Sequence, residues 1–205
     1  MKDRDYLRIT DFLYELGTMR KLLRMHRQVL MTDDLSDNIA SHSFRVAMIG
    51  FMLAKMEKAD SYKTMTMCLV HDFDEIRSGD HNWLHKRYVE VDDNQITSEQ
   101  LGTLPFDDLE KLALEYKERK SKESIVAKDA DLLDQVLLLR EYSWTGNKEA
   151  ELWLLGKRDK RSKNTQLKSL QTKSAKRIGR EIMKRGPSDW WKYLWTPKNR
   201  KNGKK

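Results

Sequence analysis

A chain of 205 residues, of which 39% are hydrophobic and 35% charged, is long enough for one domain with a full core. No apolar run approaches the roughly 20 residues that cross a bilayer, and the charged N-terminus lacks a signal-peptide core, which excludes a membrane partner. A single cysteine, Cys68, excludes an internal disulfide, so we expect a reducing, cytoplasmic location.

Helical periodicity dominates the first three quarters of the chain. Ile9, Phe12 and Leu16 recur at three- and four-residue spacing, and Phe44 and Met48 begin a second, more apolar repeat that we expect at the centre of the core. Only 9 glycines and 3 prolines are present to punctuate strands, so the predicted fold class is all-α. The predicted helices cover residues 5–31, 41–58, 61–73, 106–120, 121–143 and 147–156, and the segment 91–105 is predicted to be a loop.

The last quarter of the chain differs from the rest in charge. Residues 1–156 contain 22 Lys and Arg against 29 Asp and Glu, whereas residues 157–205 contain 18 against 3. We therefore predict a domain at 1–156 and a basic, Trp-rich helical extension at 157–205, with a linker at 157–164 and a weak helical stripe over 165–185. We predict that the aromatic cluster around Trp190 and Trp191 packs on the bundle or on a sister subunit, and that the tail 198–205 is disordered.

Four side chains in order along the chain indicate a metal site. His42 lies in one predicted helix, the adjacent pair His71 and Asp72 ends the next, and Asp131 lies on the long later helix. Two imidazoles and two carboxylates suit one divalent cation such as Mn, Co, Fe, Zn or Mg. Because the set contains no cysteine, it is typical of a catalytic site that keeps positions for water rather than of a closed structural zinc site. A cation held in this way can activate water for attack on a phosphate ester.

Three motifs carry a family resemblance. The segments SHSFRVA (41–47), LVHDFDEIRSGD (69–80) and AKDADLLDQVL (127–137) resemble the HD-domain superfamily of metal-dependent phosphohydrolases. They are most similar to its branch of small 5'-deoxynucleotidases, over residues 12–156. The resemblance implies an HD-domain helical bundle, a nucleotide substrate, and hydrolysis of (deoxy)ribonucleoside 5'-monophosphates.

The resemblance also assigns roles to individual residues. His42, His71, Asp72 and Asp131 match its metal ligands, and Glu75 matches an acidic residue that orients water and moves protons. The predicted substrate contacts lie in the same motifs or just before them. Arg27 is the predicted phosphate ligand, and Arg20 and Arg24 in the same predicted helix compete with it for that role. These contacts are Arg27 for the phosphate, Asp80 and Ser78 for the sugar, and Lys128 for either a phosphate or a surface ion pair.

The chain departs from the branch at two positions. Gln28 stands where the branch often has an aromatic residue that closes over the sugar, and Ser41 stands where it commonly has Glu before the first ligand. The first departure bears on the choice between ribose and deoxyribose, and the second on the surroundings of His42.

Several alternatives remain open from the sequence. His81 and His85, four residues apart, are candidates for a second metal, which a cyclic dinucleotide hydrolase or a dinuclear iron oxygenase would need. Other candidate substrates are a nucleoside triphosphate and an alarmone. The basic segment 157–205 favours a further alternative, weak nucleic-acid binding, and the tryptophans are consistent with a homodimer.

Overall fold

The computed structural model describes residues 1–157, 166–192 and 194, and it confirms the all-α prediction. No strand forms in this part of the chain, where Leu23 and Asn38 make an isolated bridge. The α-helices are α1 (Asp3–Leu16), α2 (His26–Leu30), α3 (Ile39–Glu57), α4 (Ser61–Val70), α5 (Glu75–Ser78), α6 (Asp93–Gln100), α7 (Asp108–Glu118), α8 (Lys122–Trp144), α9 (Lys148–Leu154), α10 (Gln166–Ser169) and α11 (Lys173–Lys184). Short 3-10 turns cover Met19–Lys21, His85–Arg87 and Asp189–Trp191.

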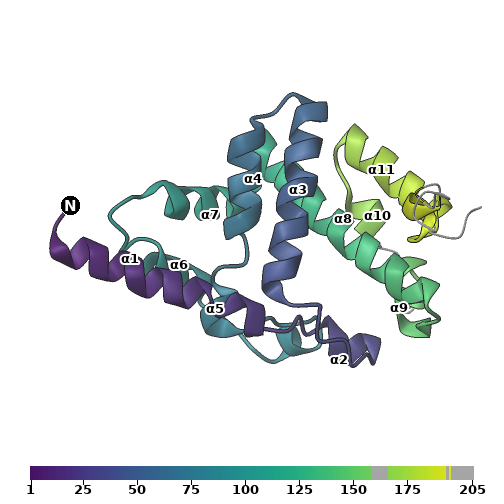
Figure 1. Cartoon of the computed structure of the whole chain (residues 1–205), viewed down its shortest axis with the longest axis horizontal. Coiled ribbons are helices and arrows are strands. Elements are labelled where there is room, and N and C mark those ends of the chain that lie inside the picture. The colour runs from purple at the N-terminus through teal and green to yellow at the C-terminus, as the bar shows by residue number, and fades with distance from the viewer. Residues whose placement is uncertain (158–165, 193, 195–205) are drawn as a thin grey trace, which may run out of the picture.

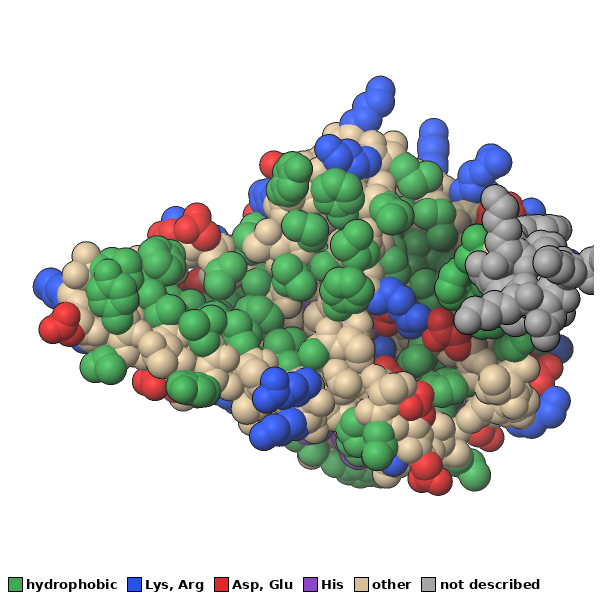
Figure 2. Space-filling model, viewed as in Figure 1, with side chains coloured by type: hydrophobic (Ala, Val, Ile, Leu, Met, Phe, Trp, Pro, Cys, Tyr) green, Lys and Arg blue, Asp and Glu red, His purple; other side chains and the backbone are tan. Residues whose placement is uncertain are grey.

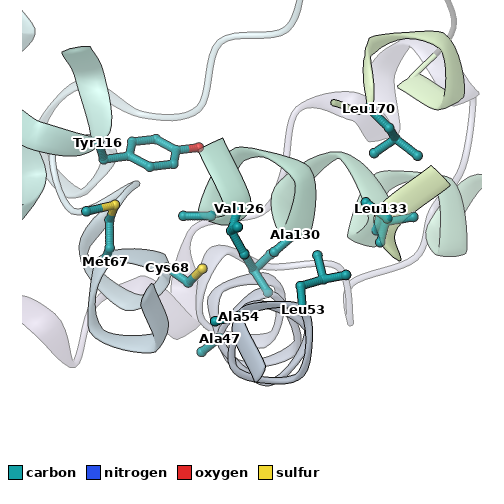
Figure 3. Packing of buried hydrophobic residues seen from close by; sticks show 13 residues of the cluster. Ala47, Leu53, Ala54, Met67, Cys68, Tyr116, Val126, Ala130, Leu133 and Leu170 are labelled. Atoms are coloured by element: carbon teal, nitrogen blue, oxygen red, sulfur yellow. The ribbon is translucent and has the colours of Figure 1, made fainter. Parts of the chain in front are cut away.

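The core lies where α3, α4 and α8 pack together (Figure 1). Side chains from all three helices meet there, among them Leu53, Met67, Val126 and Leu133 (Figure 3). These four side chains and that of Val46 are completely buried. Each such side chain contributes roughly 1.5–3 kcal/mol by leaving water. The predicted central position of the second helix is therefore confirmed.

Helix α3 also has an apolar face that remains exposed in the described part of the chain. Phe44, Met48 and Met52 remain 68%, 41% and 57% exposed, although the sequence pattern alone does not separate them from the buried side of the helix. Figure 2 shows that hydrophobic side chains gather on the face of the molecule formed by this part of the chain and by α1.

The prediction of one helix over residues 5–31 is wrong. Helix α1 ends at Leu16, and the chain then extends so that Arg24 N–H donates to Asp37 (3.0 Å) and Ile39 N–H donates to Leu22 (2.9 Å). Only after this extended stretch does α2 begin. These backbone bonds to a distant segment replace helical ones, and they change which side chains of this region face the interior.

The predicted loop over 91–105 is also wrong, because it contains α6. Asp92 caps that helix by accepting from Gln95 N–H (2.9 Å). The buried residues of α6 are Thr97 and Gln100, and the Gln100 side chain donates to the carbonyl of Phe73 (3.1 Å). A helix that buries polar side chains leaves no apolar repeat for the sequence to show.

The stripe predicted over 165–185 forms two helices that pack on α8. Leu170 and Ala175 belong to the same core as α3 and α4. The buried carboxylate of Asp129 on α8 accepts hydrogen bonds from the backbone of Gln171 (2.9 Å) and Thr172 (2.7 Å), which fixes the start of α11. Of the predicted linker, only residue 157 is described.

The described aromatic residues at the end of the chain lie on the surface. Trp190 and Trp191 meet edge to face at 4.9 Å, and both rings remain more than half exposed. Of the two predicted partners for this cluster, the bundle does not cover Trp190 and Trp191, and packing on a sister subunit stays a prediction. The predicted tail 198–205 lies outside the described residues. None of the described helices combines the length and the apolar composition that crossing a bilayer requires.

Candidate metal centre

The four predicted ligands converge from three elements. His42 lies near the start of α3, His71 and Asp72 follow the last residue of α4, and Asp131 lies in the middle of α8. His42 Nε2 is 3.3 Å from His71 Nε2, 3.3 Å from Asp72 Oδ2 and 3.5 Å from Asp131 Oδ1. His71 Nε2 is 3.1 Å from Asp72 Oδ2 and 4.0 Å from Asp131 Oδ1. Since helix α4 ends at Val70, two adjacent residues can turn toward one point.

Hydrogen bonds on the far side of each imidazole fix how the rings face. His42 Nδ1 donates to Asp134 Oδ2 (2.7 Å), and His71 Nδ1 donates to the carbonyl of Cys68 (2.7 Å). Both rings therefore direct Nε2 toward the centre, and partners of this kind typically make an imidazole a better ligand. Asp134 in turn accepts from Arg45 and lies 3.6 Å from Arg24 NH1.

The electrostatics of the cluster favour a cation. Burial opposes ionisation of Asp72, but His71 and His42 outweigh it and hold the Asp72 pKa well below its usual range. Burial likewise opposes ionisation of Asp131, whose pKa Lys128 and His71 lower strongly. Burial and Arg24 lower the pKa of His42, but hydrogen bonds to Asp134 and Asp72 raise it to about 9. A proton thus occupies the cluster where a metal ion would replace it.

These residues fit a divalent metal ion. Among the described residues, His42, His71 and Asp72 form a group whose ligand atoms all lie within 4.8 Å of one another. Lys128 Nζ binds Asp131 Oδ2 at 2.6 Å, which leaves Oδ1 to face the imidazoles. Two nitrogens and two carboxylate oxygens without a thiolate match the borderline and hard divalent cations of the predicted set. The cofactor is a divalent metal ion, as predicted.

A cavity of about 540 Å³ opens beside the cluster. Its volume is in the range of pockets for small organic ligands. Both basic and acidic side chains line its wall. The candidate site residues among them are His71, Asp72, Asp131, Arg24, Glu75, Ser78, Asp80 and Lys128. The structure therefore brings eight functional candidates to one hollow.

Glu75 lies in this cavity, at the first position of α5. Burial and the carboxylates of Asp72 and Asp80 raise the pKa of Glu75 to about 11, and its Oε2 is buried without a hydrogen-bond partner. A divalent cation at the neighbouring cluster would lower this pKa again, because it favours the charged carboxylate. Glu75 is thus a buried carboxyl group in the wall of the same cavity as Asp72 and Asp131.

Arg27 does not reach this cavity. It lies 3.9 Å from Asp33 and lines a separate, shallow groove together with Gln28. Arg24, only 6% exposed, lines the cavity instead, and its NH1 has no hydrogen-bond partner. The extended stretch before α2 explains the difference, because it turns residue 24 inward where a continuous helix would have favoured another position.

Asp80 and Ser78 lie at the cavity wall, and each already makes a hydrogen bond within the protein. Asp80 Oδ2 accepts from the backbone N–H of Met25 (2.6 Å), and Ser78 Oγ donates to the carbonyl of Asp74 (3.2 Å). Asn82, which is almost fully buried, donates to the carbonyl of Met25 (2.9 Å). The loop after α5 thus holds the segment that carries Arg24.

The two positions that depart from the branch have local roles. Gln28 Oε1 accepts from Asn82 Nδ2 (2.9 Å), and Ser41 forms a capping box with Asn38 at the start of α3. His81 and His85 meet edge to face with ring centroids 5.8 Å apart, and His81 lines the cavity. Neither belongs to a group of three or more ligand side chains in the described part of the chain.

The sequence interpretation missed three residues at the site. Asp134 lies three positions after Asp131, a spacing that places both on one helix face and is the signal that would have found it. Tyr116, which packs edge to face on His71 at 5.3 Å, and the neutral His26 in the cavity wall gave no such signal. Their positions depend on helix packing.

Comparisons with known proteins agree with this geometry. A family model described as "HD domain" matches residues 19–173. The chain is 30% identical over 126 residues to the 5'-deoxynucleotidase HDDC2 of Dictyostelium discoideum, which covers 53% of this chain and 64% of that relative. Among solved structures, a protein from Pyrococcus horikoshii OT3 is 27% identical with a TM-score of 0.64, covering 83% of this chain and 98% of its own. A predicted metal-dependent phosphohydrolase from Magnetospirillum magnetotacticum MS-1 is 23% identical with a TM-score of 0.64, covering 87% and 91%, and shows the fold.

Proposed function

This chain belongs to the HD-domain family of metal-dependent phosphohydrolases, and on that premise we propose that it is a 5'-nucleotidase. It would release inorganic phosphate from (deoxy)ribonucleoside 5'-monophosphates. One observation carries the proposal: a single cavity is lined by His71, Asp72 and Asp131 of the ligand cluster and by the buried Arg24, whose NH1 lies 3.6 Å from Asp134 but makes no hydrogen bond. The similarity to a relative named as a 5'-deoxynucleotidase supports it, although the chain spans only 64% of that relative.

The ligands in this proposal are His42, His71, Asp72 and Asp131. A divalent ion at this cluster supplies positive charge that polarises a phosphate ester and acidifies water. Asp134 keeps His42 in the tautomer that offers Nε2, and Lys128 keeps Asp131 Oδ1 directed at the imidazoles.

The phosphate is assigned to Arg24 in place of Arg27. A guanidinium carries several donors in a planar fork that matches phosphate oxygens. Arg24 NH1 is buried in an ion pair with Asp134 at 3.6 Å but makes no hydrogen bond, which costs free energy that a bound phosphate would offset. Arg24 also lines the same cavity as Glu75 and Asp72, which supports a phosphate site that the arginine shares with the cluster.

Glu75 is assigned the transfer of a proton in this reaction. The water oxygen bonds to phosphorus while the bond from phosphorus to the 5' oxygen breaks, and the products are a nucleoside and inorganic phosphate. The water loses a proton and the 5' oxygen gains one, and Glu75 is placed to hold or pass a proton at its unpartnered Oε2. Asp80 and Ser78, on the adjoining wall, are assigned to the sugar.

Two additional cations favour a second candidate substrate. Lys86 and Arg119 also line the cavity, and each could meet a phosphate beyond the first. A nucleoside triphosphate or an alarmone would use them, whereas a nucleoside monophosphate would not.

The test is phosphate release from a panel of ribo- and deoxyribonucleoside mono- and triphosphates. Metal-stripped protein is resupplied with Mn, Co, Fe, Zn or Mg, with Asp72→Ala as the inactive control. We expect metal-dependent release from 5'-monophosphates that is absent in the control. Silence on monophosphates with activity on triphosphates would transfer the proposal to the second candidate.

A paired substitution tests the assignment of the phosphate. Arg24→Lys keeps the charge but removes the fork, so we expect kcat/KM to fall at least tenfold, while Arg27→Lys changes it less than threefold. Steady-state kinetics on the best nucleotide measure both variants. A larger loss in Arg27→Lys would return the phosphate to Arg27.

A further inference from the structure

His26, the first residue of α2, is a cavity residue to which the mechanism above gives no role. Its ring lies edge to face against Trp153 of α9, with centroids 5.2 Å apart, and its Nε2 is 3.2 Å from the side-chain nitrogen of Gln135 on α8. Both His26 and Gln135 line the cavity beside the metal cluster. The other ring nitrogen, Nδ1, is buried without a hydrogen-bond partner.

The hydrogen bonds of Gln135 determine which nitrogen of His26 carries the proton. Gln166 Nε2, on α10, donates to Gln135 Oε1 at 3.0 Å. The carbonyl oxygen of the Gln135 side chain therefore accepts from Gln166, and the NH2 group of the same amide faces His26 Nε2. That ring nitrogen must accept, so a neutral His26 carries its hydrogen on Nδ1.

The ring is neutral at physiological pH. Burial and the nearby Arg24 guanidinium lower the pKa of His26 to about 3. Only one ring nitrogen then carries hydrogen, and the relay from Gln166 through Gln135 leaves Nδ1 as that nitrogen.

The position of Gln166 depends on the C-terminal segment. Its neighbour Leu167 packs on the core, and α11 approaches so closely that a Cβ on Gly179 would lie 2.7 Å from Leu167 Cδ2. Helix α10 is part of the basic extension, yet the hydrogen bond from Gln166 to Gln135 connects it to the cavity wall.

We propose that His26 is a substrate-binding residue whose Nδ1–H donates to an oxygen of the nucleotide, and that Gln135 and Gln166 are positioning residues that set its tautomer. The inference rests on the proposed nucleotide substrate and extends it. A neutral donor beside the cluster selects an oxygen acceptor without adding charge to a site that already holds Arg24 and a metal ion. An unpartnered buried N–H also costs roughly 1–3 kcal/mol, which a ligand oxygen relieves.

The tautomer is testable without any catalytic assay. In 15N-labelled protein, we expect the ring nitrogen shifts of His26 to show hydrogen on Nδ1. Gln166→Glu can only accept, so Gln135 would turn its NH2 toward residue 166 and its carbonyl toward His26, moving the hydrogen to Nε2. Hydrogen on Nε2 in the natural protein, or no change in Gln166→Glu, overturns the relay.

The same nitrogen signal identifies the acceptor. Inorganic phosphate and a deoxynucleoside are titrated separately into the metal-loaded protein. A shift of the Nδ1 signal with phosphate assigns the donor to the phosphate, and a shift with the deoxynucleoside assigns it to the sugar or base. Absence of a shift with both overturns the substrate contact.

Kinetics with two matched variants complete the test. Asn places its amide nitrogen near the position of Nδ1, whereas Gln places it near Nε2. We therefore expect His26→Asn to keep kcat/KM within about threefold, and His26→Gln and Gln166→Glu to lose about tenfold to a hundredfold, as for a hydrogen bond to a charged or polar acceptor. Equal losses in His26→Asn and His26→Gln contradict the inference.

The proposed nucleotidase activity and the proposed role of His26 can be contradicted by different results. If the natural protein releases no phosphate from any nucleotide, the proposed function fails while the tautomer measurement on the free protein still decides the relay. If the natural protein is active and His26→Gln keeps full kcat/KM, the inference about His26 fails and the proposed function stands.

Discussion

Asp131 and Asp134 lie three residues apart on α8 and serve His42 from opposite sides of its ring. Asp131 Oδ1 lies 3.5 Å from Nε2, on the side where a metal ion would bind, and Asp134 Oδ2 accepts from Nδ1 at 2.7 Å. A carboxylate in the second position fixes the tautomer and the orientation of the ligand. Asp134 would therefore act on a bound metal ion through His42.

We predict that Asp134→Asn weakens metal binding by about tenfold to a hundredfold, since an amide holds the imidazole less firmly and no longer compensates its charge. Competition with a metallochromic chelator measures the affinity. The matched control is Asp129→Asn, which removes another buried carboxylate of the same helix that contacts α11 instead of the cluster. Equal metal affinities in the two variants would contradict the role of Asp134.

The lowered pKa of His26 makes the free energy of unfolding depend on pH. Its pKa is about 3 in the folded protein, against 6.5 ordinarily, because of burial and Arg24. Between these values the unfolded chain binds more protons than the folded one, so the free energy of unfolding falls as pH falls below 6.5. We expect this residue to cost about 2 kcal/mol at pH 5 relative to pH 7.

The measurement is urea unfolding of the metal-free natural protein and of His26→Asn at pH 7 and pH 5. Both proteins share every other titrating group, so only the difference in their pH dependence belongs to His26. Parallel curves would show that His26 takes up a proton equally well in the folded state.

Among single residues, the sequence predicted those whose proposed role follows from a motif and missed those that helix packing brings to the site. His71 and Asp72 are recognisable as an adjacent pair at a helix end. Arg24 was weighed but not chosen, because its inward direction depends on an extended stretch that pairs with residues 37–39. Those backbone bonds are long-range, and periodicity in the residues around Arg24 gives no sign of them.

At the scale of elements, α3 and α4 are close enough that only a glycine fits between them. A Cβ on Gly50 would lie 2.5 Å from Cys68 Sγ and 3.5 Å from Thr64 Cγ2. Cys68 is completely buried, so its sulfur could move aside only by displacing the side chains packed around it. The carbonyl of the same residue orients His71, so this contact also supports the metal centre.

We predict that Gly50→Ala destabilises the protein by about 1–3 kcal/mol, the usual cost of overpacking. Urea unfolding measures it. Adding Cys68→Ala removes the atom that clashes, so the double variant should lose less free energy of unfolding than the sum of the two single variants. Additive losses would mean that the sulfur does not set the distance between the helices.

Most helices predicted from apolar periodicity formed, whereas helix α6 and the break after α1 left no sign in that pattern. Helices α3, α7, α8 and α9 match their predicted ranges closely. Helix α6 was missed because its buried side chains are polar, with Gln100 bonded to Phe73 and to Glu15. The break at residue 17 was missed because the apolar spacing continues through it.

At the scale of the whole molecule, the basic segment is both part of the core and a charged surface. Leu170 and Ala175 pack with α3, α4 and α8, whereas Lys176, Arg177 and Arg180 of α11 are exposed. The HD-domain match also extends to residue 173, beyond the predicted boundary at 156. Deleting the segment would therefore damage the core, and the charged face is better tested by substitution.

Weak nucleic-acid binding through this face stays a prediction with a defined test. We expect single-stranded nucleic acid to bind with an affinity that falls steeply with salt, and Lys176→Glu with Arg180→Glu to abolish it without changing the free energy of unfolding. Fluorescence anisotropy at several salt concentrations measures the affinity. Absence of binding by the natural protein at physiological salt would remove this alternative.

The predicted homodimer likewise stays a prediction. The uncovered face of α3 at Phe44, Met48 and Met52 is a candidate surface for it, and the exposed pair Trp190 and Trp191 is another.

The central claim is that one divalent ion at His42, His71, Asp72 and Asp131 makes this chain a nucleotide phosphohydrolase. The most direct test titrates metal into stripped protein while bound metal and phosphate release from a deoxynucleoside 5'-monophosphate are measured on the same samples. We predict that release rises in proportion to bound metal and saturates at one ion per chain, and that His42→Ala neither binds the ion tightly nor releases phosphate. Release that is indifferent to metal, or full occupancy of the cluster without release from any nucleotide, would contradict the account.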